Sequence, residues 1–271
     1  MGGFGRRFCR ALCCVLSFGF SACVPWVAVT TEMSGPLGST SRGVLVNGTE
    51  MPHRGDGYEF YHRRDRRYGS VPLTRLVEDV AARVADVYPG SELKVGDESG
   101  RGGGRILGHS SHRNGLDVDF AFFVRSPKKT QTRAYVLAPL DQYGVATTDR
   151  DVAYFDYEKN WQLIEALLTS DEAQVQWIFV SSGLKVRLLS YALAAGKDIE
   201  LVYRAAHVLH QPKDSAIHND HFHVRIYCPP QNESVACVQR KPIWPWIDKS
   251  FLNEDPGPDD HTLVTLALEG L

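Results

Sequence analysis

Two short stretches of the chain combine the alternation of a β-strand with a high density of histidines and aspartates, and they constrain the fold most. In GHSSHRNGLDVDF (108–120), apolar side chains at positions 116, 118 and 120 alternate with Asp117 and Asp119. In HNDHFHVRI (218–226), His221, His223 and Arg225 alternate with apolar residues in the same way. Because successive side chains of a strand point to opposite faces, each stretch predicts a half-buried strand with an apolar back and a polar front.

The rest of the chain predicts helices and strands in irregular order. Apolar residues recur at helical spacing between Pro72, which suits the first turn of a helix, and Pro89, which ends it. Further helices are predicted near 160–168, 184–195 and 198–209, and further strands near 93–95 and 175–181. Since neither an internal repeat nor a regular βαβ order is visible, the predicted class is α+β, with the main domain at 58–240.

The first 22 residues have the pattern of a secretory signal. Three arginines precede an apolar run over 11–22, and no acidic residue occurs before Glu32. That run is too short to span a bilayer comfortably, and no later segment approaches the roughly 20 apolar residues of a transmembrane helix. The sequence FSAC (20–23) resembles a bacterial lipidation site at Cys23, and simple cleavage near Ala22 or Ala28 is the alternative. We therefore expect a periplasmic protein, with a lipid anchor at Cys23 as one possibility.

The segments that flank the predicted domain lack a sustained pattern. Residues 23–57 are rich in Thr, Ser, Gly and Pro and are interpreted as a linker and irregular lead-in. Residues 241–271 are interpreted as a C-terminal extension, with a packed irregular crossing of the surface at 241–250 and a short helix at 261–271. Within the domain, the basic segment YHRRDRRYGS (61–70) is interpreted as a solvated loop, with a site for an anionic ligand as the alternative.

The positions of the cysteines predict a disulfide, and the charge of the chain argues against one class of partner. Four of the six cysteines lie in or at the end of the signal, so Cys228 and Cys237 are expected to form a disulfide in an oxidising compartment. The 30 Lys and Arg, less the three signal arginines, leave 27 basic residues against 32 acidic ones, a net charge of −5. This balance argues against a nucleic-acid partner. The glycine run at 102–104 lacks the spacing of a phosphate-binding loop.

The clustering of histidines indicates a metal site. Seven of the ten histidines fall into two clusters, which are His109 and His112, and then His207, His210, His218, His221 and His223. A hydrolytic zinc site usually has three His or carboxylate ligands and one open position for water. His112, Asp119 and His223 can supply such a set. Two histidines and a carboxylate also hold Fe(II) in intracellular oxygenases, but the signal segment counts against that class.

The same residues carry a resemblance to a known family. The stretches GHSSHRNGLDVDF, HNDHFHVRIYCP, VLHQP (208–212) and RRYGSVPL (66–73) resemble the penicillin-insensitive murein endopeptidases, the MepA family of the LAS metallopeptidases, over most of residues 58–230. The resemblance implies Zn²⁺ ligation by His112, Asp119 and His223, with His109, His218 and His221 around the active site. It also implies a small antiparallel sheet flanked by helices, and cleavage of D-alanyl to meso-diaminopimelyl cross-links in peptidoglycan.

The roles of the surrounding polar residues are open at this point. No HExxH motif occurs, so His221 is predicted to accept a proton from water or to stabilise the oxyanion, with orientation of a ligand as the alternative. His109 and His218 are predicted to bind substrate, to donate to the oxyanion, or to hold a ligand through hydrogen bonds. Asp117 is expected to orient a ligand imidazole or to cap the glycine-rich loop. Arg225 is expected to meet either a substrate carboxylate or Asp117, and His207 and His210 are interpreted as structural.

Two other functions fit the same residues. A D,D-carboxypeptidase would use a similar zinc core on the ends of stem peptides rather than on cross-links. A cell-wall-binding lipoprotein would keep the fold without catalysis, although the presence of every predicted ligand favours an enzyme.

Overall fold

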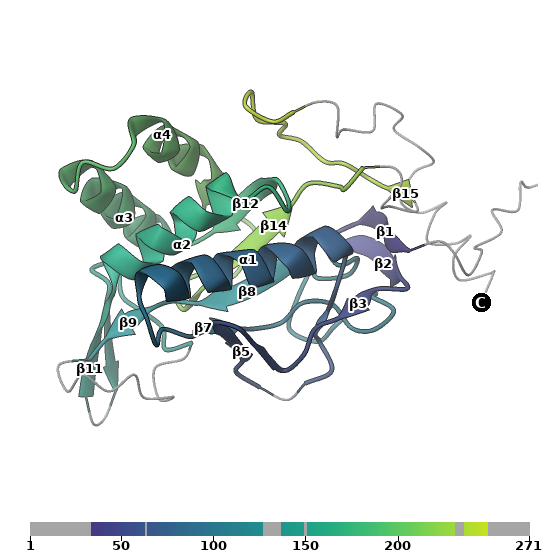
Figure 1. The fold of residues 1–271 in the computed structure, drawn as a ribbon, viewed down its shortest axis with the longest axis horizontal. Helices are drawn as coiled ribbons and strands as arrows, with labels where there is room; N and C mark the ends of the chain where they lie inside the picture. Colours follow the sequence, from purple (N-terminus) through teal and green to yellow (C-terminus); the bar gives the residue numbers. More distant parts are fainter. Residues whose placement is uncertain (1–33, 63, 127–136, 149–150, 231–235, 249–271) are drawn as a thin grey trace, which may run out of the picture.

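A seven-stranded mixed sheet forms the centre of the computed structural model, which describes residues 34–62, 64–126, 137–148, 151–230 and 236–248 (Figure 1). The strand order is β13-β12-β14-β8-β7-β5-β4. In chain order these strands are β4 (Arg54–Gly55), β5 (Tyr58–Phe60), β7 (Leu93–Val95), β8 (Asp117–Ala121), β12 (Val175–Phe179), β13 (Leu209–His210) and β14 (His221–Ile226).

The α+β class is confirmed, but the expected sheet is wrong in size and in direction. The central sheet is larger than the small one predicted, and two of its strand pairs, β12 with β13 and β5 with β7, run parallel. The extra strands were missed because they are short: the outer strands β4 and β13 have two residues each. Strands this short carry no detectable alternation in a sequence.

The two predicted amphipathic strands lie side by side at the centre of this sheet. β8 and β14 pair antiparallel, with His223 opposite Asp119 and Arg225 opposite Asp117. Their other faces carry fully buried apolar side chains, namely Val118, Phe120, Phe222 and Val224. The predicted apolar backs and polar fronts are thus confirmed, and pairing places both polar fronts on one face of the sheet.

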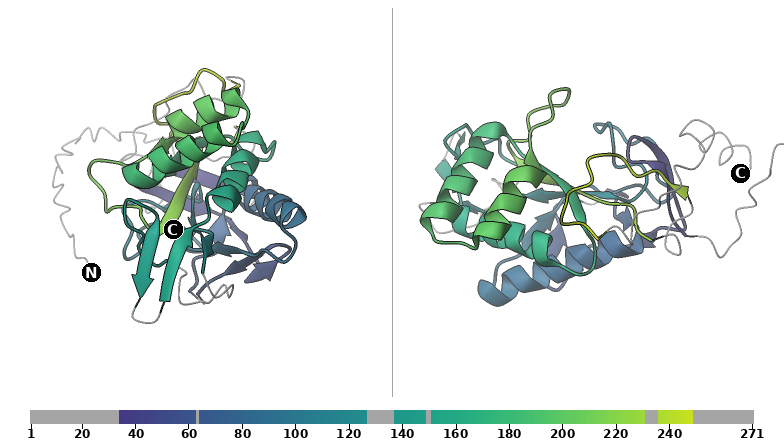
Figure 2. Two further views of the ribbon diagram at one scale, coloured as in Figure 1. Left: turned by 90° about the vertical axis from the view of Figure 1, so that its left-hand side faces the viewer. Right: turned by 90° about the horizontal axis from the view of Figure 1, so that it is seen from above.

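Helices α1 and α2 cover the apolar face of the sheet, and α3 and α4 lie towards the β12 end (Figures 1 and 2). Pro72 stands in the first turn of α1, and Leu73, Leu76, Val77 and Val80 are fully buried beneath it. Each such side chain contributes about 1.5–3 kcal/mol through burial. The bounds are α1 (Val71–Val87), α2 (Tyr157–Thr169), α3 (Ser182–Ala194) and α4 (Ile199–Val208), close to the predicted ranges.

The expected irregular lead-in is wrong over residues 35–55, which contain regular strands. β1 (Gly35–Ser39) and β2 (Arg42–Val46) form a hairpin, followed by β3 (Thr49–Glu50), which pairs with β6 (Tyr68–Gly69). Side chains of both strands are buried, including Leu37 and Leu45. The sequence hid this hairpin because its turns and glycines resemble a flexible segment.

The hairpin supports the loop that carries His112. The side-chain amide of Asn114 donates to the Gly38 carbonyl at 3.0 Å, and the Arg113 amide donates to the Thr40 carbonyl. Gly103 has φ +69° and packs so closely between Arg113 and Leu45 that a Cβ would lie 2.1 Å from the Arg113 carbonyl oxygen. The glycine run therefore serves close backbone packing around this loop.

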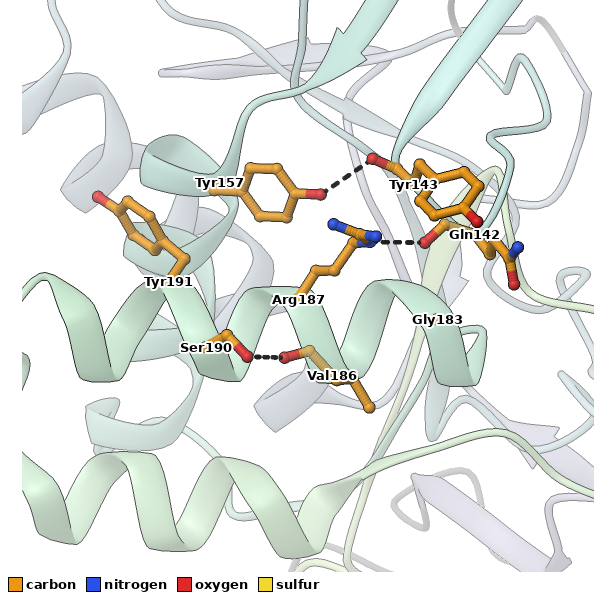
Figure 3. Close-up of a pocket in the computed structure, with 8 residues that line it drawn as sticks. All are labelled: Gln142, Tyr143, Tyr157, Gly183, Val186, Arg187, Ser190 and Tyr191. Atoms are coloured by element: carbon orange, nitrogen blue, oxygen red, sulfur yellow. Dashed lines mark hydrogen bonds between the residues drawn. The ribbon is translucent and has the colours of Figure 1, made fainter.

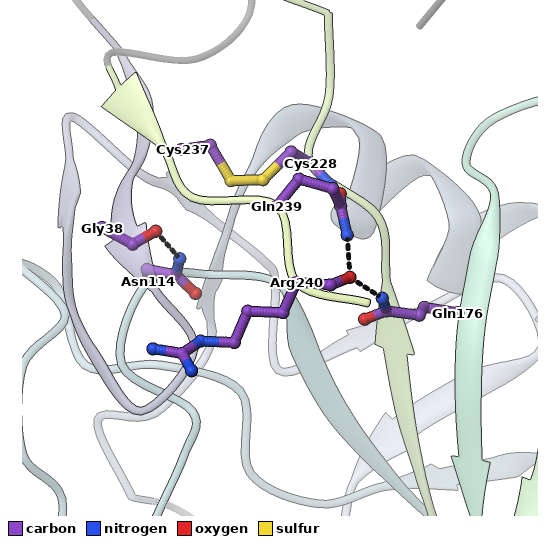
Figure 4. The surroundings of a disulfide bond; sticks show 7 residues. All are labelled: Gly38, Asn114, Gln176, Cys228, Cys237, Gln239 and Arg240. Carbon is purple, nitrogen blue, oxygen red and sulfur yellow. Dashed lines mark hydrogen bonds between the residues drawn. A yellow bond between two sulfur atoms is a disulfide. The ribbon is translucent and has the colours of Figure 1, made fainter. Parts of the chain in front are cut away.

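The predicted disulfide between Cys228 and Cys237 is confirmed, with 5.8 Å between the Cα atoms (Figure 4). It joins the chain just after β14 to β15 (Ala236–Cys237), which pairs parallel with β1. A loop of this size restricts the unfolded chain by roughly 2–3 kcal/mol. The disulfide thus fixes the end of the strand that carries His223 onto the hairpin beneath the His112 loop.

The remaining strands form a small sheet that contributes Ala146, Ala153 and Phe155 to the core, and the tryptophan-rich segment packs as predicted. β9 (Val124–Arg125), β10 (Val145–Thr148) and β11 (Asp151–Phe155) form a separate antiparallel sheet. Trp244 donates to the Gln176 carbonyl, and Ile247 is buried. The predicted signal and the predicted helix at 261–271 lie outside the described residues. Within the described ranges, none of the helices has the length and apolarity needed to cross a bilayer.

Candidate metal centre

Three side chains from the polar face of the central sheet and the loop before it converge on one point. Nε2 of His112 lies 3.2 Å from Oδ1 of Asp119 and 3.2 Å from Nδ1 of His223. Nδ1 of His223 lies 3.3 Å from the same Asp119 oxygen. All three residues are buried, with exposed fractions of 0%, 5% and 5% for His112, Asp119 and His223. The predicted triad is therefore brought together by the fold.

The spacing of these donor atoms fits a tetrahedral cation. Ligands about 2.0–2.1 Å from a tetrahedral zinc ion lie about 3.3 Å from one another, which matches the three distances. Oδ1 of Asp119 is buried and accepts no hydrogen bond in the described part of the chain, although imidazole nitrogens surround it within ion-pair distance. An orphaned buried carboxylate oxygen is costly unless a cation or donor satisfies it.

Asp117 holds two members of the triad, as one of its two predicted roles requires. Its Oδ1 accepts from Nε2 of His223 at 3.1 Å and from Nε of Arg225 at 2.6 Å. Its Oδ2 accepts from the backbone amide of His112 at 2.9 Å. Arg225 thus pairs with Asp117, and the proton on Nε2 of His223 leaves the Nδ1 lone pair directed at the triad. His112 has φ +62°, a strained conformation for a residue with a side chain, which this bond holds in place.

The electrostatics of the triad favour a positive charge at its centre. Burial alone would raise the pKa values of both carboxyl groups, but Arg225 and His223 hold the pKa of Asp117 below its usual range, and the imidazoles of His112 and His221 hold the pKa of Asp119 well below it. Burial opposes protonation of His223, yet the two carboxylates raise its pKa above the ordinary value. A metal ion would compete with the protons on these imidazoles, so its binding releases protons.

The three further predicted site histidines line the same point. Nε2 of His221 lies 3.6 Å from Oδ1 of Asp119, while its Nδ1 lies 2.5 Å from Asp220. His109 places Nδ1 4.0 Å from Oδ2 of Asp119, and donor atoms of His218, His221 and His223 lie within 4.8 Å of one another. Burial and the two neighbouring imidazoles lower the pKa of His218 to about 4. The two histidines interpreted as structural lie apart, since His207 contacts the Tyr203 carbonyl and His210 packs on Trp177.

Asp97 is a site residue that the sequence did not indicate. Oδ2 of this buried carboxylate accepts from His109 at 2.9 Å and from Arg66 at 2.6 Å, and its Oδ1 lies 2.8 Å from Nε2 of His62, within ion-pair distance. Burial raises its pKa, but these partners outweigh burial and hold it below the usual value. Its only sequence signal was a position just after a short strand. The basic segment 61–70 was wrongly interpreted as a solvated loop, because part of it pairs with this internal anion.

Glu98, the neighbour of Asp97, is expected to make the stability of the protein depend on pH. It is fully buried, and neither carboxylate oxygen has a hydrogen-bond partner among the described residues. Burial raises its pKa from 4.5 to about 8. The folded protein holds this proton more tightly than the unfolded chain does. The contribution of the protonated Glu98 to the free energy of unfolding is therefore complete below about pH 4 and is lost as the pH rises through 8.

Glu98→Gln is therefore expected to weaken the fall in stability as the pH rises from 5 to 8. Between pH 5 and pH 8 the free energy of unfolding of the unsubstituted protein should decline by a few kcal/mol more than that of the variant, at up to about 1.4 kcal/mol per pH unit. Urea unfolding at both pH values measures the difference. Parallel declines in the two proteins would contradict the assignment of this buried proton.

Together these contacts define an α+β protein with a buried His and Asp cluster of the kind that holds a divalent metal ion. The chain belongs to the family of penicillin-insensitive murein endopeptidases, whose family model matches residues 36–247. The match begins within β1, in agreement with the ordered hairpin found there.

Curated relatives agree with this membership. The chain is 32% identical over 213 residues to the penicillin-insensitive murein endopeptidase of Haemophilus influenzae, covering 77% of this chain and 68% of that protein. It is 30% identical over 237 residues to the protein of that name from Klebsiella pneumoniae, with 85% and 80% covered. The identity to the relative from Escherichia coli O157:H7 is 30% over 222 residues, with 80% and 75% covered.

Proposed function

We propose that the protein is a zinc-dependent peptidoglycan endopeptidase that cleaves D-alanyl to meso-diaminopimelyl cross-links. The observation that carries this proposal is the triad of His112, Asp119 and His223, whose donor atoms have tetrahedral spacing, in a chain of the murein endopeptidase family. Three protein donors leave one position of a tetrahedral ion open, as hydrolytic zinc sites require.

In this proposal the triad holds the ion, and the surrounding residues handle protons. When bound, zinc would lower the pKa of its water to ~7 and polarise the scissile carbonyl. Asp117 keeps His223 in the tautomer that presents Nδ1. His221, held by Asp220 through Nδ1, has its Nε2 free to accept the proton of the attacking water and to pass it to the leaving amine. Burial and the carboxylates around His221 act in opposite directions, and its pKa is raised above the ordinary value.

The two remaining histidines are assigned to the polarised substrate. His218 is held neutral at physiological pH by its lowered pKa, so one ring N–H can donate to the developing oxyanion. His109 is fixed by Asp97 and places its Nδ1 4.0 Å from Oδ2 of Asp119, where it can orient the peptide. The same residues would serve a D,D-carboxypeptidase, and the products of digestion distinguish the two activities.

The proposed location follows from the substrate. Peptidoglycan lies outside the cytoplasm, so the predicted signal at 1–22 would deliver the protein to the periplasm. We retain the lipid anchor at Cys23 as part of the proposal, and mass measurement of the mature amino terminus tests it. We also keep the division into a catalytic domain and a C-terminal extension after residue 240 as a proposal.

Digestion of purified cross-linked muropeptide dimers tests the activity and the bond choice together. We expect conversion of dimers to monomers, loss of conversion with a metal chelator, recovery on addition of zinc, and no effect of β-lactams. Chromatography with mass detection identifies the products. Release of terminal D-alanine with intact dimers would show a carboxypeptidase instead, and binding of dimers without any product would show a wall-binding protein.

A further inference from the structure

An open pocket of about 610 Å³ lies between the first turn of α2, helix α3 and the chain just before β10 (Figure 3). Three tyrosines and one arginine dominate its walls, namely Tyr143, Tyr157, Tyr191 and Arg187. The rings of Tyr157 and Tyr191 are stacked with 6.1 Å between centroids, and the Tyr157 hydroxyl donates to the Tyr143 carbonyl at 3.3 Å. The volume is in the range of ligand-binding pockets.

Backbone contacts tie this pocket to the candidate metal centre. The backbone amide of Leu140 donates to the Asn219 carbonyl at 2.8 Å, and the Asn219 side chain returns a bond to the Leu140 carbonyl at 2.9 Å. Asn219 follows His218 directly, and the His218 carbonyl accepts from the Ser181 amide at 2.6 Å, where α3 begins. Gly183 allows α3 to approach Gln142, because a Cβ there would lie 2.9 Å from the Gln142 Cβ.

Arg187 is exposed and supplies a positive charge that has no acidic partner among the described residues. Its Nε donates to the Gln142 carbonyl at 2.9 Å, and its guanidinium carbon lies 4.8 Å from the Tyr143 ring centroid. In Figure 3 this group points from α3 towards Tyr157 and Tyr143. No carboxylate in the described ranges lies within ion-pair distance of it. The terminal nitrogens of the fork remain available for two parallel hydrogen bonds to a planar anion.

Two aspartates next to the pocket, Asp141 and Asp156, are engaged in other contacts. Oδ1 of Asp141 accepts from the backbone amides of Tyr143 and Val145, at 2.8 and 2.9 Å. Asp156 accepts from the Lys159 amide at the start of α2, and its other oxygen faces Arg125. The pocket therefore combines one free guanidinium with aromatic walls, a chemistry that suits a carboxylate attached to an apolar stem.

We propose that this pocket binds a free carboxylate on the peptide arm of the substrate, with Arg187 as the residue that recognises it; this inference rests on the proposed function. Arg187 lies six residues beyond Ser181, which is about 9 Å along a helix. Three or four residues of an extended peptide span about 10–14 Å. In this proposal a stem peptide whose cross-link lies at the metal centre extends past the start of α3 and places a carboxylate of the same arm in the pocket.

Arg187→Ala is tested with cross-linked muropeptide dimers whose stem carboxylates are either free or amidated, and Arg75→Ala is the control. Arg75 is an exposed arginine on α1, so its removal changes the net charge equally. For the unsubstituted protein and for Arg75→Ala, we expect amidation to raise KM about tenfold. For Arg187→Ala we expect that ratio to fall five- to tenfold, with kcat on free dimers largely retained, since a bidentate charged contact acts on binding.

The outcomes separate this inference from the proposed function. An unchanged amidation ratio in Arg187→Ala, or an equal fall in Arg75→Ala, overturns the carboxylate pocket while cleavage of dimers stands. Calorimetry measures the binding of free and amidated dimers to Asp119→Ala and to the double variant that also carries Arg187→Ala. The ratio of the two affinities gives the same comparison without turnover. If the unsubstituted protein cleaves neither dimer, the proposed function fails, and the binding ratio alone supports or overturns the pocket.

Discussion

His223→Ala is expected to abolish zinc binding at one equivalent per chain and to lower kcat/KM for muropeptide dimers by roughly a thousandfold or more. The Nδ1 atom of His223 lies 3.2 Å from His112 Nε2 and 3.3 Å from Asp119 Oδ1, so its removal leaves two donors for the ion. A metal ion stabilises the transition state by several kcal/mol, and loss of that stabilisation corresponds to a factor of this size. Metal content is measured by atomic emission after dialysis, and activity by chromatography of muropeptides.

Asp119→Ala is expected to behave in the same way, because its Oδ1 is the oxygen shared by both ligand imidazoles. His207→Ala is the matched control, since His207 lies on α4 and contacts the Tyr203 carbonyl and Trp246 rather than the cluster. Circular dichroism confirms that each variant is folded. Full metal content or undiminished cleavage in either ligand variant would contradict the assignment of the triad.

His221→Ala is expected to retain the metal but to lower kcat by about 10²–10⁴-fold, the usual contribution of a general acid–base group. Its Nε2 lies 3.6 Å from Oδ1 of Asp119, while Asp220 holds the other ring nitrogen. This places His221 beside the triad rather than within its tetrahedral spacing. Metal analysis and the pH profile of kcat, measured on the same preparations, separate a catalytic role from a ligand role.

The comparison with Asp220→Asn sharpens this second experiment. An amide keeps the size of the Asp220 side chain but removes the charge that contributes to the raised pKa of His221. We expect a smaller loss of kcat in Asp220→Asn and a shift of the acidic limb of the profile to lower pH. If His221→Ala loses zinc as His223→Ala does, His221 is a ligand and the proposed proton-transfer role is wrong.

Part of the site was readable from the sequence because strand geometry is local. The alternation in 116–120 and 221–226 placed Asp117, Asp119, His221 and His223 on polar faces, and the pairing of β8 with β14 confirms both faces. The long helix after Pro72 and the single pair of cysteines outside the signal were equally readable. The strand and helix signals each lie within a few neighbouring residues, and the disulfide followed because only two cysteines lie outside the signal. None of these predictions required knowledge of distant contacts.

Other parts were decided by contacts between distant segments. Asp97 joins the centre only because β7 pairs beside β8 and because His62 and Arg66 fold back onto it. The ordered hairpin of β1 and β2 resembled a linker, although it supports the His112 loop through Gly38 and Asn114. The pocket around Arg187 is likewise assembled from three separate segments, none of which carries a recognisable motif.

The sequence by itself determined which residue types face the polar side of two strands and that the class is α+β. The signal before the domain stays a prediction from the sequence. Only the tertiary structure decided that His112, Asp119 and His223 lie at the spacing of one ion, and that Asp117 fixes the tautomer of His223. The reason is physical: side-chain direction along a strand follows from local backbone geometry, whereas coordination depends on the register between strands far apart in the chain.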